Sequence, residues 1–325
     1  MPDHCAAVTS DEATARRRAA SPIYAPVTVT QPAEGDAALP DRAHVGGFVR
    51  PLVQPADAFG VLFYPRISYE VTIYPSPQAT RADLAGALED AVAAARRLDR
   101  DLAARHPDIP ASDRWIAARL PARDVDLAAA AFGAGFRLVS CEAHARVDAL
   151  QRRLAARPGE SPAIATPIPA DEDALTEALV ALQAYDHPFM GGFPVRDTQR
   201  RFMAQHAAAA IARGAPWTSV VRDPEDALAA VLTVTPPAES AWTYADLTID
   251  SAAYLGFAWT APKRRGEGLM GALIRQAVDG VARQGIEDMT IGFAYHNPLG
   301  APYWMGLGFA PTWATWVHAP GLVEA

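Results

Sequence analysis

The order of apolar and polar residues over positions 163–325 shifts between helical and strand periods. Apolar residues three and four positions apart predict helices over 171–185 and 197–213, and a short one over 298–307. Short apolar runs between turn-forming residues predict strands. These runs occupy residues 217–222, 227–235, 252–260, 288–295 and 309–317.

The clearest helix is expected over 269–284, where the apolar residues fall on one face and Gly285 is placed to end the helix. The expected strand 252–260 precedes this helix and the expected strand 288–295 follows it, which forms a parallel crossover. The whole pattern predicts an α+β fold, a mixed sheet flanked by helices.

Two stretches lack periodicity and are rich in Pro, Ala and Gly. Residues 1–43 are expected to be a largely disordered lead-in, and residues 151–162 to be a linker. They separate a first half, residues 44–150, from a second half, residues 163–325. A chain of 325 residues is long enough for two such domains.

Charge and composition exclude several functional classes. A formal charge of −8 argues against a broad nucleic-acid-binding face. No apolar run reaches the roughly 18 residues that a membrane span needs, and the first twenty residues lack a secretory signal. The 2 cysteines cannot build a disulfide framework or a thiolate metal cluster. We therefore expect a cytoplasmic protein without nucleic-acid, membrane or metal partners.

The loop Arg265-Gly266-Glu267-Gly268-Leu269-Met270-Gly271 connects the expected strand 252–260 to the amphipathic helix. The first turn of a helix leaves backbone N–H groups unpaired, and the helix dipole adds positive charge there. Glycine has no Cβ to hold a phosphate away from those donors. The loop is therefore predicted to bind a phosphate, although glycines also serve ordinary tight turns.

Two other phosphate motifs fit this loop less well. A Walker loop requires Gly-Lys-Ser/Thr, which is absent here. The segment 266–271 matches the spelling Gly-x-Gly-x-x-Gly of a dinucleotide site, but it lies late in the chain and no doubly wound alternation follows it. A nucleotide-binding oxidoreductase remains an alternative.

The loop resembles the coenzyme A signature of the GNAT superfamily of acetyltransferases, Arg/Gln-x-x-Gly-x-Gly/Ala. The signature maps onto Arg265, Gly268 and Met270. Methionine at the last position departs from the pattern and is partly compensated by Gly271. The family also carries an asparagine, an aromatic residue seven positions later and Gly-Phe after that. Here these residues are Asn297, Trp304, Gly308 and Phe309.

This resemblance implies a GNAT-like fold for the second half and acetyl-CoA, or another acyl-CoA, as cosubstrate without a metal. Backbone groups of Ala258 and Thr260 would pair with the pantetheine arm and the thioester. The residues implied in cofactor binding are Ala258, Thr260, Arg264, Arg265, Gly266, Gly268, Leu269, Met270, Gly271, Asn297 and Trp304.

Catalytic residues follow less directly from the resemblance. Trp304 occupies the position of the usual tyrosine acid and has no O–H to donate, so the adjacent Tyr303 is the candidate acid, with a structural aromatic as the alternative. Tyr254 stands where several relatives carry a glutamate base. A base acting through water could instead be Asp246, Asp250 or His296. The segment with Asp186 and His187 is expected to contact the acceptor.

The first half resembles a degenerate copy of the same plan. Residues 67–75 resemble the strand before the loop, and residues 80–104 resemble the helix after it. The connection 75–79 holds two prolines and no glycine, and proline has no N–H to donate. We expect a second, smaller GNAT-like domain that holds no pyrophosphate, with an unrelated dimerisation domain as the alternative.

The sequence thus favours an N-acyltransferase that moves an acyl group, expected to be acetyl, from acyl-CoA to an amine by direct attack on the thioester. The alternative is a non-catalytic acyl-CoA-binding regulatory module. The acceptor is a small-molecule or protein amine, and the oligomeric state is left open, a homodimer included.

Overall fold

A computed structural model describes residues 8–40, 42–156, 162–191, 198–225 and 227–318. Its α-helices are α1 (Ser10–Ala20), α2 (Arg81–Arg105), α3 (Val125–Gly133), α4 (Val147–Ala155), α5 (Glu172–Asp186), α6 (Gln199–Arg213), α7 (Pro237–Ser240), α8 (Leu269–Arg283) and α9 (Gly300–Leu307). Its strands are β1 (Ala37–Ala38), β2 (Val45–Val53), β3 (Ile67–Pro75), β4 (Arg114–Pro121), β5 (Arg137–Arg146), β6 (Ile164–Ala165), β7 (Thr218–Arg222), β8 (Leu228–Thr235), β9 (Ala253–Thr260), β10 (Asp288–Ala294) and β11 (Ala310–His318).

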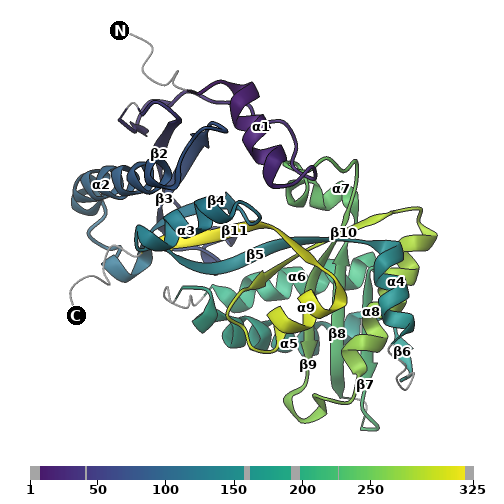
Figure 1. Cartoon of the computed structure of the whole chain (residues 1–325). Helices are drawn as coiled ribbons and strands as arrows, with labels where there is room; N and C mark the ends of the chain where they lie inside the picture. Colours follow the sequence, from purple (N-terminus) through teal and green to yellow (C-terminus); the bar gives the residue numbers. More distant parts are fainter. Residues whose placement is uncertain (1–7, 41, 157–161, 192–197, 226, 319–325) are drawn as a thin grey trace.

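The strands form one 11-stranded sheet in the order β1-β2-β3-β4-β11-β5-β10-β9-β8-β7-β6 (Figure 1). β3 pairs with β4 in parallel, and so does β9 with β10, while the remaining named pairs are antiparallel. Each parallel pair is joined by one long helix, α2 or α8. The predicted α+β class and the parallel crossover around the glycine loop are confirmed.

The two halves share a repeated unit and exchange its last strand. β3-α2-β4-α3-β5 in the first half repeats as β9-α8-β10-α9-β11 in the second. β5 pairs with β10 of the second half, and β11 pairs with β4 of the first. The exchanged strands also pair with each other. The sheet is therefore continuous from one half to the other.

Helices cover the two faces of this sheet differently. Val221 packs in the core beneath α8, whereas its neighbour Val220 packs beneath α5 and α6, because successive side chains of a strand point to opposite faces. Trp316 on β11 contacts both the α8 core and the α2 core, so these two helices lie on one face. The opposite face carries α5 and α6 in the second half.

Residues 1–43 were expected to lack regular structure, and this needs correction. Residues 10–20 form α1, in which Thr9 and Glu12 make a reciprocal capping box. The spelling Thr-x-x-Glu was the available local signal for this helix. Residues 1–7 and 41 lie outside the described residues.

The helix and strand boundaries of the second half agree closely with the pattern, but the start of the expected linker needs correction. Of the expected linker 151–162, residues up to Ala155 belong to α4, and residues 157–161 lie outside the described part of the chain. Position 197, where a helix start was expected, is also outside it, and α6 begins at Gln199. No helix among the described residues combines the length and apolarity needed to cross a membrane.

Candidate functional site

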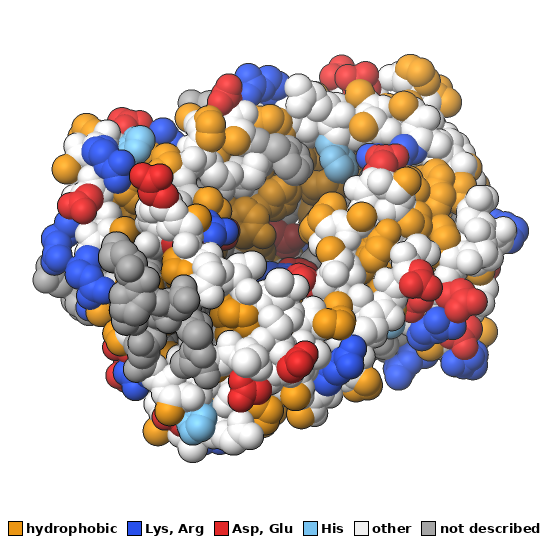
Figure 2. Space-filling view, turned by 90° about the horizontal axis from the view of Figure 1, so that it is seen from above, with side chains coloured by type: hydrophobic (Ala, Val, Ile, Leu, Met, Phe, Trp, Pro, Cys, Tyr) orange, Lys and Arg blue, Asp and Glu red, His pale blue; other side chains and the backbone are white. Residues whose placement is uncertain are grey.

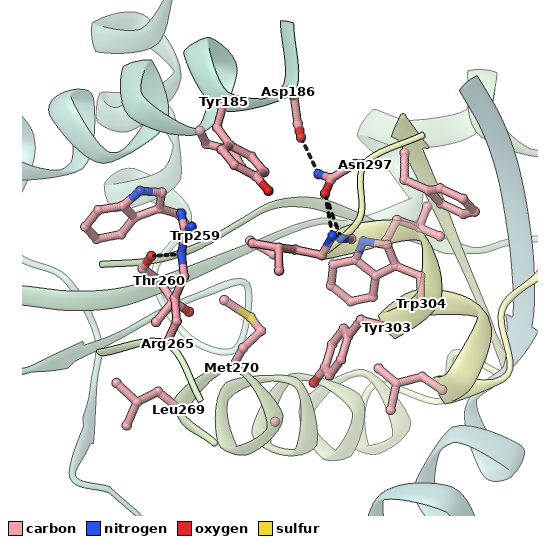
Figure 3. A pocket seen from close by; sticks show the side chains of 18 of the residues that line it. Tyr185, Asp186, Trp259, Thr260, Arg265, Leu269, Met270, Asn297, Tyr303 and Trp304 are labelled. Carbon is pink, nitrogen blue, oxygen red and sulfur yellow. Dashed lines mark hydrogen bonds between the residues drawn. The ribbon is translucent and has the colours of Figure 1, made fainter. Parts of the chain in front are cut away.

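A cavity of about 550 Å³ lies where β9 and β10 separate, between α5, α8 and α9 (Figure 3). The two parallel strands are paired from Ala253 to Leu255 and then diverge. The cavity is lined by every residue that the resemblance implied in cofactor binding: Ala258, Thr260, Arg264, Arg265, Gly266, Gly268, Leu269, Met270, Gly271, Asn297 and Trp304.

The start of α8 forms one end of the cavity. Gly268 is its N-cap with φ +76°, and Gly266 has φ +87°, conformations that favour glycine. Nothing described lies within 4 Å of a Cβ built at either glycine. No described side chain caps α8, and the first N–H bonded within the helix is that of Ala272. The N–H groups of residues 269–271 are therefore available to an anion.

β9 presents a free backbone edge to the same cavity. The N–H of Phe257 is bonded to Thr233 of β8, and that of Ala261 to Ala229. Backbone N–H groups alternate between the two edges of a strand, so those of Ala258 and Thr260 point away from β8. This edge is open because β10 has diverged from β9 at that level.

The basic residues of the loop have different neighbours. The Arg265 guanidinium lies 5.1 Å from the centre of the Tyr185 ring, and its Nε donates to the Thr260 carbonyl at 3.4 Å. Arg264 is paired with Glu267 at 2.7 Å, which compensates its charge. Arg265 is thus the basic side chain of this loop that is better placed to meet a phosphate.

Asn297 fixes a carboxylate at the far end of the cavity. Its Oδ1 accepts from the N–H groups of Leu299 and Gly300 at 2.8 and 2.9 Å, which caps α9. Its Nδ2 therefore points outward and donates to Oδ1 of Asp186 at 2.5 Å (Figure 3). Burial raises the pKa of Asp186 to about 6, although the bond from Asn297 opposes this shift. Asp186 can exchange a proton near neutral pH.

Tyr303 and Trp304 both line the cavity from α9. The Tyr303 hydroxyl lies 3.8 Å from a Cβ built at Gly271, at the first turn of α8. Trp304 is buried, and its ring packs against Tyr303 and Phe309. Trp304 is therefore a packing residue, and the adjacent Tyr303 supplies a hydroxyl.

Five candidate residues do not line this cavity: Tyr254, His187, His296, Asp246 and Asp250. Asp246 is paired with Arg119, and Asp250 is exposed. Tyr254 lies on the sheet face beneath Trp242, and burial raises its pKa to about 12, so it holds its proton at neutral pH. His296 is exposed beside Tyr295. His187 follows Asp186 in a short 3-10 turn, and of these two neighbours Asp186 alone is a lining residue. Among the described residues, no cluster of His, Cys, Asp and Glu could hold a metal ion.

In the first half, side chains of the protein bond to the loop before α2 and to the start of that helix. Thr80 caps α2, and the Asp83 carboxylate accepts from the N–H of Thr80, so these donors are used. Arg16 of α1 donates to the carbonyls of Ser76 and Ala79 at 3.4 and 3.0 Å. Side chains thus accept from the N–H groups of Thr80 and Asp83 at the start of α2, and a cation lies on the carbonyls of the preceding loop, whereas no described side chain caps α8.

No family model and no curated protein matches the chain. Solved structures do. A GCN5-related N-acetyltransferase from Sphaerobacter thermophilus is 14% identical over 84% of this chain and 76% of its own, with a TM-score of 0.50. A tandem GNAT protein from the clavulanic acid biosynthesis pathway is 19% identical over 84% and 78%, with a TM-score of 0.46. A GCN5-related N-acetyltransferase from Kribbella flavida is 15% identical over 97% and 96%, with a TM-score of 0.43. The first of these matches, together with the topology, shows that the chain has a GNAT-like fold.

Proposed function

We propose that this protein is an acyl-CoA-dependent N-acyltransferase that transfers an acetyl group to an amine. The observation that carries the proposal is the cavity itself. Its one end is an uncapped helix start with free N–H groups, and its other end holds a carboxylate whose pKa lies near 6. Acyl transfer from coenzyme A requires a site for its diphosphate and a group that takes the proton from the attacking amine. This cavity holds an anion site and a proton acceptor together.

The residues around the glycine loop fit coenzyme A. The N–H groups of residues 269–271 would hold the pyrophosphate, with Arg265 adding charge at its side. The N–H groups of Ala258 and Thr260 would pair with the pantetheine arm along the open edge of β9. Acyl-CoA, when bound, supplies the activated thioester. The protein positions the two substrates and transfers the protons.

Asp186 is the proposed general base. An amine arrives protonated at neutral pH and must lose a proton before it attacks a carbonyl carbon. Oδ1 of Asp186 is held by Asn297, and its second oxygen has no described hydrogen bond, so it can accept that proton. Tyr303 is the proposed acid that protonates the departing thiolate, because its hydroxyl reaches the first turn of α8.

A second function, non-catalytic binding of acyl-CoA, is favoured by one observation: Trp304 has no hydroxyl and Tyr254 lies outside the cavity. Titration calorimetry with acetyl-CoA, CoA and NAD tests the shared part of both proposals, and we expect binding of the first two and none of NAD. Release of free thiol with a panel of small and peptide amines separates the two proposals. Tight CoA binding with no thiol release from any amine would reject the enzyme.

A further inference from the structure

A second cavity, of about 590 Å³, lies on the sheet face opposite α2. Its floor consists of β3, β4, β11 and β5, and α1 forms one wall. Ile67, Tyr69 and Val71 of β3 point into the α2 core, so the alternate residues Ser68 and Glu70 point to the cavity. The surface on the side that carries α1 is hollowed, with hydrophobic and acidic side chains in the hollow (Figure 2).

Five of the charged groups that line this cavity satisfy one another. Arg119 makes paired hydrogen bonds to both oxygens of Glu142 at 2.8 and 2.6 Å and reaches Asp246 at 2.6 Å. Arg16 binds Asp124 in the same paired manner, at 2.8 and 3.1 Å. These pairs are internal to the protein, so a ligand would gain little by replacing them.

Two further charged groups of the cavity are not satisfied. Within the described part of the chain, neither the Glu70 carboxylate nor the Arg17 guanidinium has a hydrogen bond or an ion pair. Arg17 lies 4.8 Å from the centre of the Trp313 ring, which Arg119 also approaches at 4.2 Å. Glu70 lines the cavity from β3, the strand at one edge of its floor.

Both groups line the cavity, where Arg17 is half-buried and Glu70 is exposed, so the cost of desolvating the charged form is only partial for Glu70. Surrounding protein raises the pKa of Glu70 and lowers the pKa of Arg17, in each case because the charged form has lost water. The nearest charged groups compensate these costs in part: Arg50 for Glu70, and Asp246 for Arg17. A ligand that brought the opposite charge to each group would remove both costs at once.

We propose that this cavity is a binding site for a small zwitterion, with its ammonium on Glu70 and its carboxylate on Arg17. Glu70 lies on β3, four strand spacings from β10, which is roughly 19 Å at about 4.8 Å per spacing. The Glu70 end of the site is therefore distant from the proposed transfer cavity, whereas Glu142 of this cavity lies opposite Gly292 of the other across the β5–β10 pair; the proposal itself does not depend on acyl transfer. Its volume lies within the range usual for small-molecule sites.

Titration calorimetry on the full chain tests this site with glycine, β-alanine, γ-aminobutyrate and ε-aminocaproate, which vary the spacing between the two charges. The alkylamine and the carboxylate of matching length serve as single-charge probes. We expect at least one zwitterion to bind about tenfold or more tightly than both of its single-charge analogues. If no zwitterion exceeds its analogues, the proposal is wrong.

Glu70→Gln and Arg17→Gln are each expected to weaken the best zwitterion about tenfold or more. Glu89→Gln and Arg18→Gln, which change exposed residues, are the matched controls and should leave binding unchanged. Glu70→Gln should still bind the carboxylate probe, so it decides the proposal even if Arg17→Gln fails to fold. Unchanged zwitterion binding in Glu70→Gln would overturn the assignment. The Gly268→Val variant should bind the zwitterion as tightly as the parent does. Zwitterion binding can therefore be judged independently of whether the protein binds acyl-CoA.

Discussion

The two strand–helix–strand units of this protein have the same topology and opposite chemistry at the start of the long helix. In the second half, Gly268 leaves the first N–H groups of α8 open to a cavity. In the first half, Thr80 and Asp83 close the start of α2, and Arg16 donates to the carbonyls of the preceding loop. The comparison teaches that a GNAT-like backbone does not by itself make a phosphate site. The capping residues decide whether donors are free.

The largest effect is expected from the carboxylate of the second-half cavity. Asp186→Asn should reduce kcat about a thousandfold, because the amide cannot take the ammonium proton, while acetyl-CoA affinity stays the same. Thiol release and calorimetry measure the two quantities. Asp173→Asn, an exposed acid of the same helix, is the control. A kcat within threefold of the parent would remove Asp186 as base.

The first-half closure can be tested through stability. Arg16→Met should lower the free energy of unfolding by about 3 kcal/mol, since it leaves Asp124 buried without its partner, the two side chains being 11% and 9% exposed. Arg81→Met breaks the exposed pair with Asp126 and should cost less than about 1 kcal/mol. Denaturant unfolding compares the variants. Equal costs would mean that the pair of Arg16 with Asp124 contributes no more to stability than the exposed pair of Arg81 with Asp126.

The second-half loop can be tested through coenzyme A affinity. Gly268→Val should weaken CoA about a hundredfold or more, because a branched side chain resists φ +76° and a Cβ enters the space in front of the donors. Gly285→Val imposes the same backbone strain at φ +74° at the other end of α8. That control should lose similar stability and keep its CoA affinity. Equal CoA affinity in both variants would refute the loop assignment.

The smallest effect concerns pH. The pKa of Asp186 is raised to about 6, so the carboxylate is protonated and inactive as a base below that value. The kcat/KM of the parent should therefore fall about tenfold per pH unit below pH 6 and level off above it, because kcat/KM reports the pKa of the free enzyme. The residual kcat/KM of Asp186→Asn should not show this step. A pH profile of thiol release from pH 4.5 to 8 measures both, and a step retained in the variant would assign the titration to another group.

Part of this architecture could be predicted because it depends on short-range patterns. The amphipathic helix expected over 269–284 is observed as Leu269–Arg283, and the glycine loop lies at its start. The loop 75–79 holds two prolines and no glycine, and it leads into α2, whose start is capped by Thr80. Such features are set by neighbouring residues, through backbone conformation and side-chain periodicity.

Other features could not be predicted because they join distant residues. Asn297 and Asp186 are 111 positions apart, and their hydrogen bond is part of the reason that Asp186, expected as an acceptor contact, is here proposed as the base. Tyr254 and His296 were candidates by position, but neither is among the residues that line the cavity, although the Tyr254 hydroxyl lies 3.2 Å from a Cβ built at the lining residue Gly292. Arg16, which no sequence pattern singled out, meets Asp124 across 108 positions.

The sequence by itself determined most helices and strands of the second half and the glycine loop, since each is encoded in a window of a few residues. Tertiary structure decided which strand lies beside which, so that β5 and β11 exchange places between the halves. It also decided which charges find partners and which, like Glu70 and Arg17, are left facing a cavity. The physical reason is that strand pairing and charge pairing are contacts through space, and local periodicity carries no information about the partner.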